Sequence, residues 1–227
     1  MKEHFSELLE NLRRHLIGMG AEVENQIRLA MEALVEADAT KARRVIEHDR
    51  IIDELEVRNE DDTIHLLATQ QPVASDLRLL VSGLKINSGL ERIGDHAVNI
   101  AEAAERMSHV RPFKPWVDVP YMAEIARGML RDALDAFVRR DSGLALEVCQ
   151  RDDLLDDKNK SLIRELLTYM AESPALISTC IEIMGISKNL ERVGDLSTNI
   201  AEETIFIAEG QNIKHVFKAQ APDTTAS

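Results

Sequence analysis

The chain contains little cysteine, proline, glycine or aromatic residue: two cysteines, six prolines and ten glycines among 227 residues, with aromatic side chains at 4%. The two cysteines, Cys149 and Cys180, lack the spacing of a metal site. They exclude a disulfide framework and favour a reducing, cytoplasmic environment. The few glycines and prolines fall mostly between segments of regular apolar spacing, where they indicate the boundaries of secondary-structure elements.

Positive charge and long apolar runs are also scarce. The formal net charge is −13, which argues against a nucleic-acid binder because phosphate contacts need a basic face. The same charge is compatible with a cation-binding surface or a basic protein partner. No uninterrupted apolar run approaches the roughly 20 residues that cross a bilayer, and no signal peptide follows Met1. We therefore expect a soluble cytoplasmic protein that meets a membrane only through its partners.

Apolar residues recur at intervals of three and four, which is the spacing of amphipathic α-helices. A first helix is expected over roughly residues 3–37, and Asp38 should cap a second helix that extends to about Leu67. Pro72 is expected in the first turn of a third helix that ends near Arg106. Residues 109–120 hold three prolines and the only tryptophan, and this segment should connect two halves of the chain.

The second half repeats this organisation. A fourth helix is expected from Tyr121, Asp141 repeats the turn at Asp38, and a sixth helix should follow Pro174 and end near Gly210. Short turns place consecutive helices antiparallel. The expected fold class is therefore all-α: two tandem antiparallel three-helix bundles related by internal duplication, over residues 1–108 and 121–212, with a linker at 109–120 and a polar tail at 213–227.

One segment demonstrates the duplication directly. Residues 90–102 read LERIGDHAVNIAE and residues 190–202 read LERVGDLSTNIAE, so nine of the thirteen positions are identical at an offset of 100. The identities include the charged positions, whereas a helix duplicated only for packing should keep its apolar pattern and let its charges drift. The retained carboxylates therefore suggest a function.

Helical geometry places these carboxylates in one stripe. At about 100° per residue, Glu91, Asp95, Asn99 and Glu102 point in one direction, away from the apolar positions of the same helix. Glu191, Asp195, Asn199 and Glu202 repeat the arrangement in the second copy. We expect the stripe to face outward from each three-helix core.

The preceding helix of each half carries its own acidic pair. Asp49 and Asp53 stand four residues apart in the first half, and Asp152 and Asp156 match them at an offset of 103. In an antiparallel hairpin, four carboxylates would converge on one surface groove per half, and their mutual repulsion would be relieved by a multivalent cation. Oxygen-only ligands suit Mg, Ca, Mn or ferric iron, with Zn also compatible.

Two further repeated residues leave alternatives open. Arg92 and Arg192 either neutralise the stripe by forked pairing with carboxylates or form ordinary surface salt bridges. Gly94 and Gly194, in the middle of a helix, each cost roughly 1 kcal/mol relative to alanine. Close helix approach is the favoured reason for these glycines, ahead of access for a cation.

These motifs together resemble the PhoU family of phosphate-transport regulators. The resemblance rests on the doubled Leu-Glu-Arg-hydrophobic-Gly-Asp signature, the acidic pair before each copy, and the segment PVASDLR at residues 72–78, and it covers residues 3 to about 215. The second half departs from it at residues 174–177, which lack the Asp76-Leu77-Arg78 of the first half.

The resemblance implies surface-bound metal ions, with iron or zinc the favoured metals. The implied ligands are Asp49, Asp53, Glu91 and Asp95 in one half and Asp152, Asp156, Glu191 and Asp195 in the other. It further implies a homodimeric adaptor between a sensor histidine kinase and the ATPase subunit of a phosphate ABC transporter, which represses phosphate-starvation signalling when phosphate is plentiful.

Two other classes of function remain as alternatives to this non-enzymatic regulator. One is a carboxylate-bridged metalloenzyme, an oxidase or a phosphatase, although ferritin-like sites need Glu-x-x-His pairs that point into the bundle core. The other is a metal-free helical scaffold whose charges serve solubility.

Overall fold

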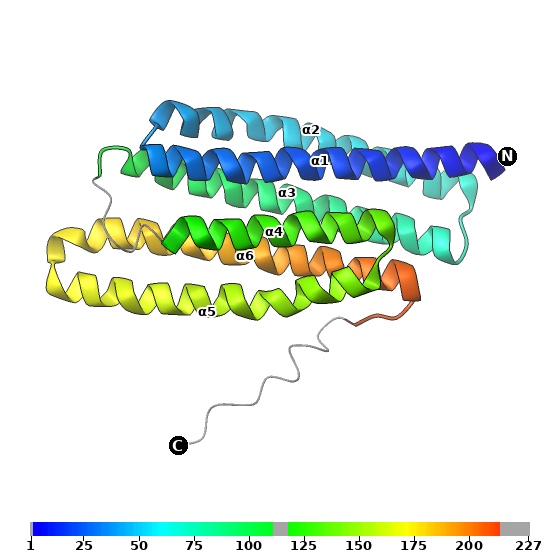
Figure 1. Ribbon diagram of the computed structural model, residues 1–227. Coiled ribbons are helices and arrows are strands. Elements are labelled where there is room, and N and C mark those ends of the chain that lie inside the picture. The colour runs from blue at the N-terminus through cyan, green and yellow to red at the C-terminus, as the bar shows by residue number, and fades with distance from the viewer. Residues whose placement is uncertain (1, 111–117, 214–227) are drawn as a thin grey trace, which may run out of the picture.

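A computed structural model describes residues 2–110 and 118–213, with side chains from Phe5 onward. In these two ranges the secondary structure consists of six α-helices and one 3-10 turn: α1 (Lys2–Glu36), α2 (Ala39–Gln70), α3 (Ser75–Met107), α4 (Asp118–Arg139), α5 (Ser142–Glu172), η2 (Pro174–Leu176) and α6 (Ile177–Glu209) (Figure 1). The described ranges contain no strand. The all-α class is confirmed, while most of the expected linker and nearly all of the expected tail lie outside the described residues.

Two helix starts are capped as expected. The Asp38 carboxylate accepts backbone hydrogen bonds from Thr40 at 2.9 Å and Lys41 at 3.0 Å, at the start of α2. The Asp141 carboxylate accepts one from Leu144 at 3.0 Å, at the start of α5. Each bond satisfies an amide that has no partner within its own helix.

The boundaries at the prolines differ from the expectation. Pro72 is not in the first turn of α3: Gln71 and Ala74 have positive φ angles of 48° and 47°, so the chain leaves the helical path on both sides of the proline. Pro174 does begin a helical turn, but a 3-10 turn that precedes α6. Helix α4 begins at Asp118, three residues before Tyr121. Pro120 therefore lies in its first turn, where proline is tolerated.

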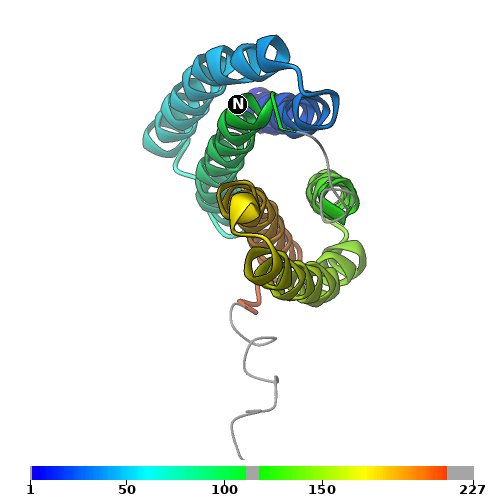
Figure 2. The same ribbon diagram turned by 90° about the vertical axis from the view of Figure 1, so that its left-hand side faces the viewer.

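The two halves pack side by side through α3 and α6, which run antiparallel (Figures 1 and 2). Polar contacts join these helices at both ends: Glu203 of α6 accepts from Ser82 of α3 at 2.7 Å, and Arg106 of α3 donates two hydrogen bonds to Glu182 of α6 at 3.0 and 2.9 Å. The pair α3 and α6 thus forms the centre of the molecule.

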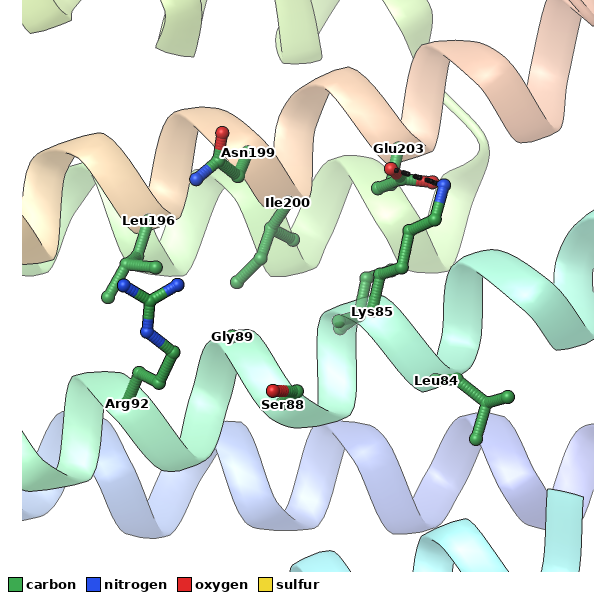
Figure 3. Close-up of a pocket in the computed structure, with 10 residues that line it drawn as sticks. Leu84, Lys85, Ser88, Gly89, Arg92, Leu196, Asn199, Ile200 and Glu203 are labelled. Atoms are coloured by element: carbon green, nitrogen blue, oxygen red, sulfur yellow. Dashed lines mark hydrogen bonds and ion pairs between the residues drawn. The ribbon is translucent and has the colours of Figure 1, made fainter.

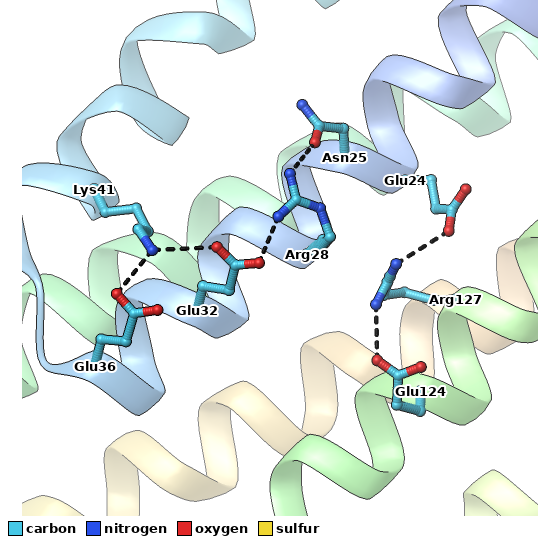
Figure 4. A network of polar contacts seen from close by, with 8 residues as sticks. All are labelled: Glu24, Asn25, Arg28, Glu32, Glu36, Lys41, Glu124 and Arg127. Atoms are coloured by element: carbon cyan, nitrogen blue, oxygen red, sulfur yellow. Dashed lines mark hydrogen bonds and ion pairs between the residues drawn. The ribbon is translucent and has the colours of Figure 1, made fainter.

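Helices α1 and α4 pack against each other on one side of this centre. Arg127 of α4 donates to Glu24 of α1 at 3.2 Å and also pairs with Glu124 on its own helix (Figure 4). Gly20 of α1 lies so close to Leu134 of α4 that an added Cβ would be 2.5 Å from its Cδ1. This contact therefore excludes a larger side chain unless Leu134 moves.

A second polar network joins α1 to the start of α2. Lys41 of α2 pairs with Glu36 at 2.8 Å and with Glu32 at 3.2 Å, and Glu32 also pairs with Arg28 (Figure 4). These exposed pairs connect the end of α1 to the first turn of α2 and add little to stability.

The end-on view shows α2, α3, α6 and α5 following one another along a curved row, with α1 and α4 on one side of it (Figure 2). We call the other side of this row the open face, since none of the described helices covers it. The apolar positions opposite the acidic stripe, such as Ile93, Ala97 and Ile100, are buried. The stripe therefore faces out of the core, as its spacing predicts.

None of the helices that the structure describes combines the length and apolar character needed to span a bilayer.

Candidate metal centre

Gly94 controls how closely α3 approaches α2. A Cβ added there would lie 3.1 Å from Cδ1 of Ile52 and 3.7 Å from Oδ1 of Asp49. At Gly194, an added Cβ would lie 2.6 Å from Cδ2 of Leu155 and 3.5 Å from Oδ1 of Asp152. The glycines are therefore positions of close helix approach, as the sequence suggests, and this approach brings the acidic residues of α2 and α5 beside the stripes.

The first cluster consists of Asp49, Asp53 and Glu56 from α2 and Glu91 and Asp95 from α3. Partial burial raises the pKa of Glu91 to about 7, and the negative charges of Asp95, Glu56, Asp53 and Asp49 add to the effect. Burial is the largest cause, and the smaller contributions come from carboxylates on both α2 and α3, which therefore lie near one another.

Two other members of the first cluster respond in the same direction. Burial raises the pKa of Asp49, with further contributions from Asp53 and Asp95. Burial also raises the pKa of Glu56, with contributions from Glu60, Asp53 and Asp95. The acidic side chains of α2 and α3 therefore form a negative cluster in which the pKa values of Asp49, Glu56 and Glu91 are raised.

The second cluster consists of Asp152 and Asp156 from α5 and Glu191 and Asp195 from α6. Burial raises the pKa of Asp156, followed by the charge of Glu191, while Lys160 and Lys188 oppose the shift. The equivalent helices α5 and α6 therefore bring carboxylates together in the second half, but the cationic side chains of Lys160 and Lys188 lie near them.

Two replacements, Lys188 for Ser88 and Asn159 for Glu56, make the second cluster less negative than the first, and Arg192 also pairs with a carboxylate there. Lys188, at the position of Ser88 in the first copy, forms an ion pair with Glu191. Arg192 donates to Asp195 at 2.9 Å. Asn159, at the position of Glu56, is buried and hydrogen-bonded inside the core. Of the two interpretations of the repeated arginine, Arg192 fits the ordinary salt bridge, because a single Nη1–Oδ2 contact joins its exposed side chain to Asp195.

The fit of these clusters to a metal ion is partial. In the chain as described, no three His, Cys, Asp or Glu side chains stand close enough together to hold a metal ion. The eight residues named from the sequence are gathered into two groups of four, with the oxygen donors that hard cations prefer. Side-chain rotation would have to close each group, so the ligand assignment stays a prediction.

Some functional candidates escaped the sequence interpretation. Lys188 could have been found by aligning the two copies, since it replaces a serine beside the stripe. His96 has no counterpart in the second copy, so the repeat assigns it no role, yet its Nδ1 lies 2.8 Å from Oδ1 of Asn189 on α6. The contact of Glu203 with Ser82 and Lys85 joins residues more than a hundred positions apart, and no local pattern announces it.

A family model described as the PhoU domain matches residues 16–104 and 119–204, one copy per half. The phosphate-specific transport system accessory protein PhoU homolog of Pseudomonas putida is 40% identical over 217 residues, which cover 95% of this chain and 85% of the relative. The protein of the same description from Pseudomonas aeruginosa is 39% identical over 217 residues, covering 95% of this chain and 90% of the relative.

Two solved structures share the fold. The crystal structure of PhoU from Pseudomonas aeruginosa matches with a TM-score of 0.89 at 40% identity, covering 91% of this chain and 100% of that one. The phosphate transport system regulatory protein PhoU from Streptococcus pneumoniae matches with a TM-score of 0.85 at 28% identity, covering 92% of this chain and 98% of that one. The tandem arrangement of two three-helix bundles is thereby confirmed.

Proposed function

Since the chain belongs to the PhoU family, we propose that it is an accessory protein of phosphate transport that acts as a metal-binding regulatory adaptor. It represses phosphate-starvation signalling when phosphate is plentiful and restrains uptake by the phosphate ABC transporter. The description shared by its relatives, and their match over nearly its whole length, support the link to phosphate transport. The adaptor acts without catalysis.

The observation that carries the metal-binding part is the convergence of carboxylates from two helices in each half. In the first cluster, burial together with the charges of the neighbouring carboxylates raises the pKa of Glu91 to about 7. A bound cation would supply the positive charge that such a cluster needs. Asp49, Asp53, Glu91 and Asp95 would hold it in the first half, and the matching second set is Asp152, Asp156, Glu191 and Asp195. Iron or zinc is the favoured cation, with Mn, Mg and Ca as alternatives.

The partners are those that the resemblance to the PhoU family implies, and the acidic clusters suggest how a bound metal ion would affect their binding. A sensor histidine kinase and the ATPase subunit of the transporter are the proposed partners in the cytoplasm, contacted by a homodimer of this chain. Neutralising the clusters would convert a repulsive acidic surface into one that an acidic partner surface can approach. If this is correct, a chelator should weaken binding of the isolated kinase sensor domain, and equal binding with and without chelator would contradict it.

Metal content tests the site itself. Protein purified without chelator should retain metal by elemental analysis, and Glu91→Ala combined with Asp95→Ala should lower the content by the share of the first cluster. The matched control is Glu191→Ala with Asp195→Ala, which should remove only the share of the second cluster. If neither double variant changes the metal content, these carboxylates are not the ligands.

Regulation is tested in the cell. Deleting the gene should raise expression of phosphate-starvation genes in phosphate-rich medium, and the wild-type gene should restore repression. Unchanged expression after deletion would remove the regulatory function whatever the metal result. Phosphatase turnover by the purified metal-loaded protein, abolished by Asp95→Ala, would instead support the enzyme alternative.

A further inference from the structure

A cavity of about 400 Å³ lies between α3 and α6, at the junction of the two bundles (Figure 3). From α3 it is lined by Ser88, Gly89 and Arg92, and from α6 by Leu196 and Asn199. The lining therefore combines hydrogen-bond donors with apolar side chains, and it includes none of the carboxylates of the two metal clusters.

An ion pair between the exposed Lys85 and the buried Glu203 forms one end of the cavity. Lys85 lies 3.0 and 3.2 Å from the two carboxylate oxygens of Glu203, and Ser82 donates to the same carboxylate at 2.7 Å (Figure 3). Glu203 is only 3% exposed. Both of its oxygens already accept hydrogen bonds from α3, so this carboxylate is neutralised and fixed within the wall.

Arg92 is the charged group that remains. Its counterpart Arg192 bonds to Asp195 at 2.9 Å within the second cluster. Arg92 instead lines the cavity, with its guanidinium close to Leu196 (Figure 3), and no ion pair of Arg92 occurs among the described residues. A guanidinium stays charged at every physiological pH and presents donors in a planar fork that matches an oxyanion.

The pseudo-equivalent position on the other side of the molecule carries different side chains. Asn189 stands where Gly89 does, and His96 stands where Leu196 does, at the offset of 100. These two side chains meet across α3 and α6, with His96 Nδ1 2.8 Å from Asn189 Oδ1. At the described cavity a glycine and a leucine stand in place of this polar contact.

We propose that this cavity binds a small oxyanion, with inorganic phosphate as the probe. Arg92 supplies the charge-assisted hydrogen bonds, and the Ser88 hydroxyl and the Asn199 amide supply neutral donors from opposite helices. Since the donors come from both α3 and α6, the affinity for the ion depends on the relative position of the two bundles. The site does not require metal in either cluster, so it can be tested independently of the proposed metal binding.

The test is calorimetric titration of the full chain with inorganic phosphate in the presence of chelator. Wild-type protein should bind phosphate, and Arg92→Gln should weaken binding about tenfold or more, as expected for a charged hydrogen bond. Arg192→Gln is the matched control, since it removes the same charge from the equivalent position, and it should change the affinity less than about threefold.

A second variant fills the cavity without removing charge. Gly89→Asn combined with Leu196→His introduces the asparagine and histidine that occupy the pseudo-equivalent position. A Cβ added at Gly89 has only Ile200 nearby, at 3.9 Å. This variant should fold, as checked by circular dichroism and thermal melting, and should lose phosphate binding. The proposal is overturned if the wild type does not bind phosphate, if both arginine variants lose it equally, or if the folded double variant still binds.

Discussion

Replacing Glu91 by glutamine should stabilise the metal-free protein at pH 8. The carboxyl group of the unfolded chain ionises near its ordinary pKa of 4.5, whereas the folded group ionises only near about 7. Between these values the folded state holds more protons than the unfolded state, so stability falls as pH rises through this window. Glutamine keeps the size of the side chain and removes the charge, so its advantage should appear only where Glu91 is ionised.

The magnitude follows from the pKa difference. At 1.36 kcal/mol per pKa unit, the change from 4.5 to about 7 sets an upper limit of about 3 kcal/mol. Glu91 is only partly buried, so screening by solvent lowers the expected gain to on the order of 1 kcal/mol at pH 8. At pH 4, where both states are protonated, the gain should vanish. Urea unfolding in chelator at both pH values measures it.

Glu191→Gln is the control for this prediction. The equivalent carboxylate is paired with Lys188, so its removal should leave stability unchanged or lower it by a few tenths of a kcal/mol. Equal effects of the two substitutions at pH 8, or a gain for Glu91→Gln that persists at pH 4, would refute the argument that burial and repulsion within the first cluster raise this pKa.

Gly194→Ala should destabilise the protein by about 1 kcal/mol, because the added Cβ would lie 2.6 Å from Leu155 and the cost of overpacking exceeds the gain in helix propensity. Gly18→Ala should instead stabilise the protein, since no atom lies within 4 Å of the added Cβ. A change of the same sign for both variants in the free energy of urea unfolding would contradict this. Asp141→Ala should lower the free energy of unfolding by about 1 kcal/mol, because it removes the N-cap of α5. Identical thermal melting curves of variant and wild type would contradict this. Burial raises the pKa of Cys149 to about 12, so iodoacetamide at pH 8 should label it only after unfolding; rapid labelling of the folded chain, seen by mass spectrometry, would contradict the burial.

The fold was accessible from the sequence because its main signals are local. Apolar spacing, the aspartates at Asp38 and Asp141, and Gly210 at the end of α6 each act within one or two helical turns, and the structure places them as expected. The prediction for Pro72 was wrong because Gln71 and Ala74 have positive φ angles, so α3 begins only at Ser75, although proline itself favours a first helical turn. Those angles depend on how α2 must turn into α3, which no local pattern records.

The candidate site was predictable to the extent that the duplication recorded it. The offset of 100 identified the stripe, and helical geometry gave its direction. The repeat could not say that Arg92 and Arg192 would point to different places, because the two copies carry the same residue there. That difference depends on what stands across the α3–α6 junction, where Leu196 faces Arg92 while Arg192 turns to Asp195.

The most direct test of the metal site is anomalous diffraction from crystals of the metal-loaded protein, with data collected on both sides of the absorption edge. The account predicts peaks within about 2.5 Å of carboxylate oxygens of Asp49, Asp53, Glu91 and Asp95, and corresponding peaks in the second cluster. Maps that show no peak in either groove, with these side chains apart and hydrated, would contradict the claim that the repeated acidic residues bind metal.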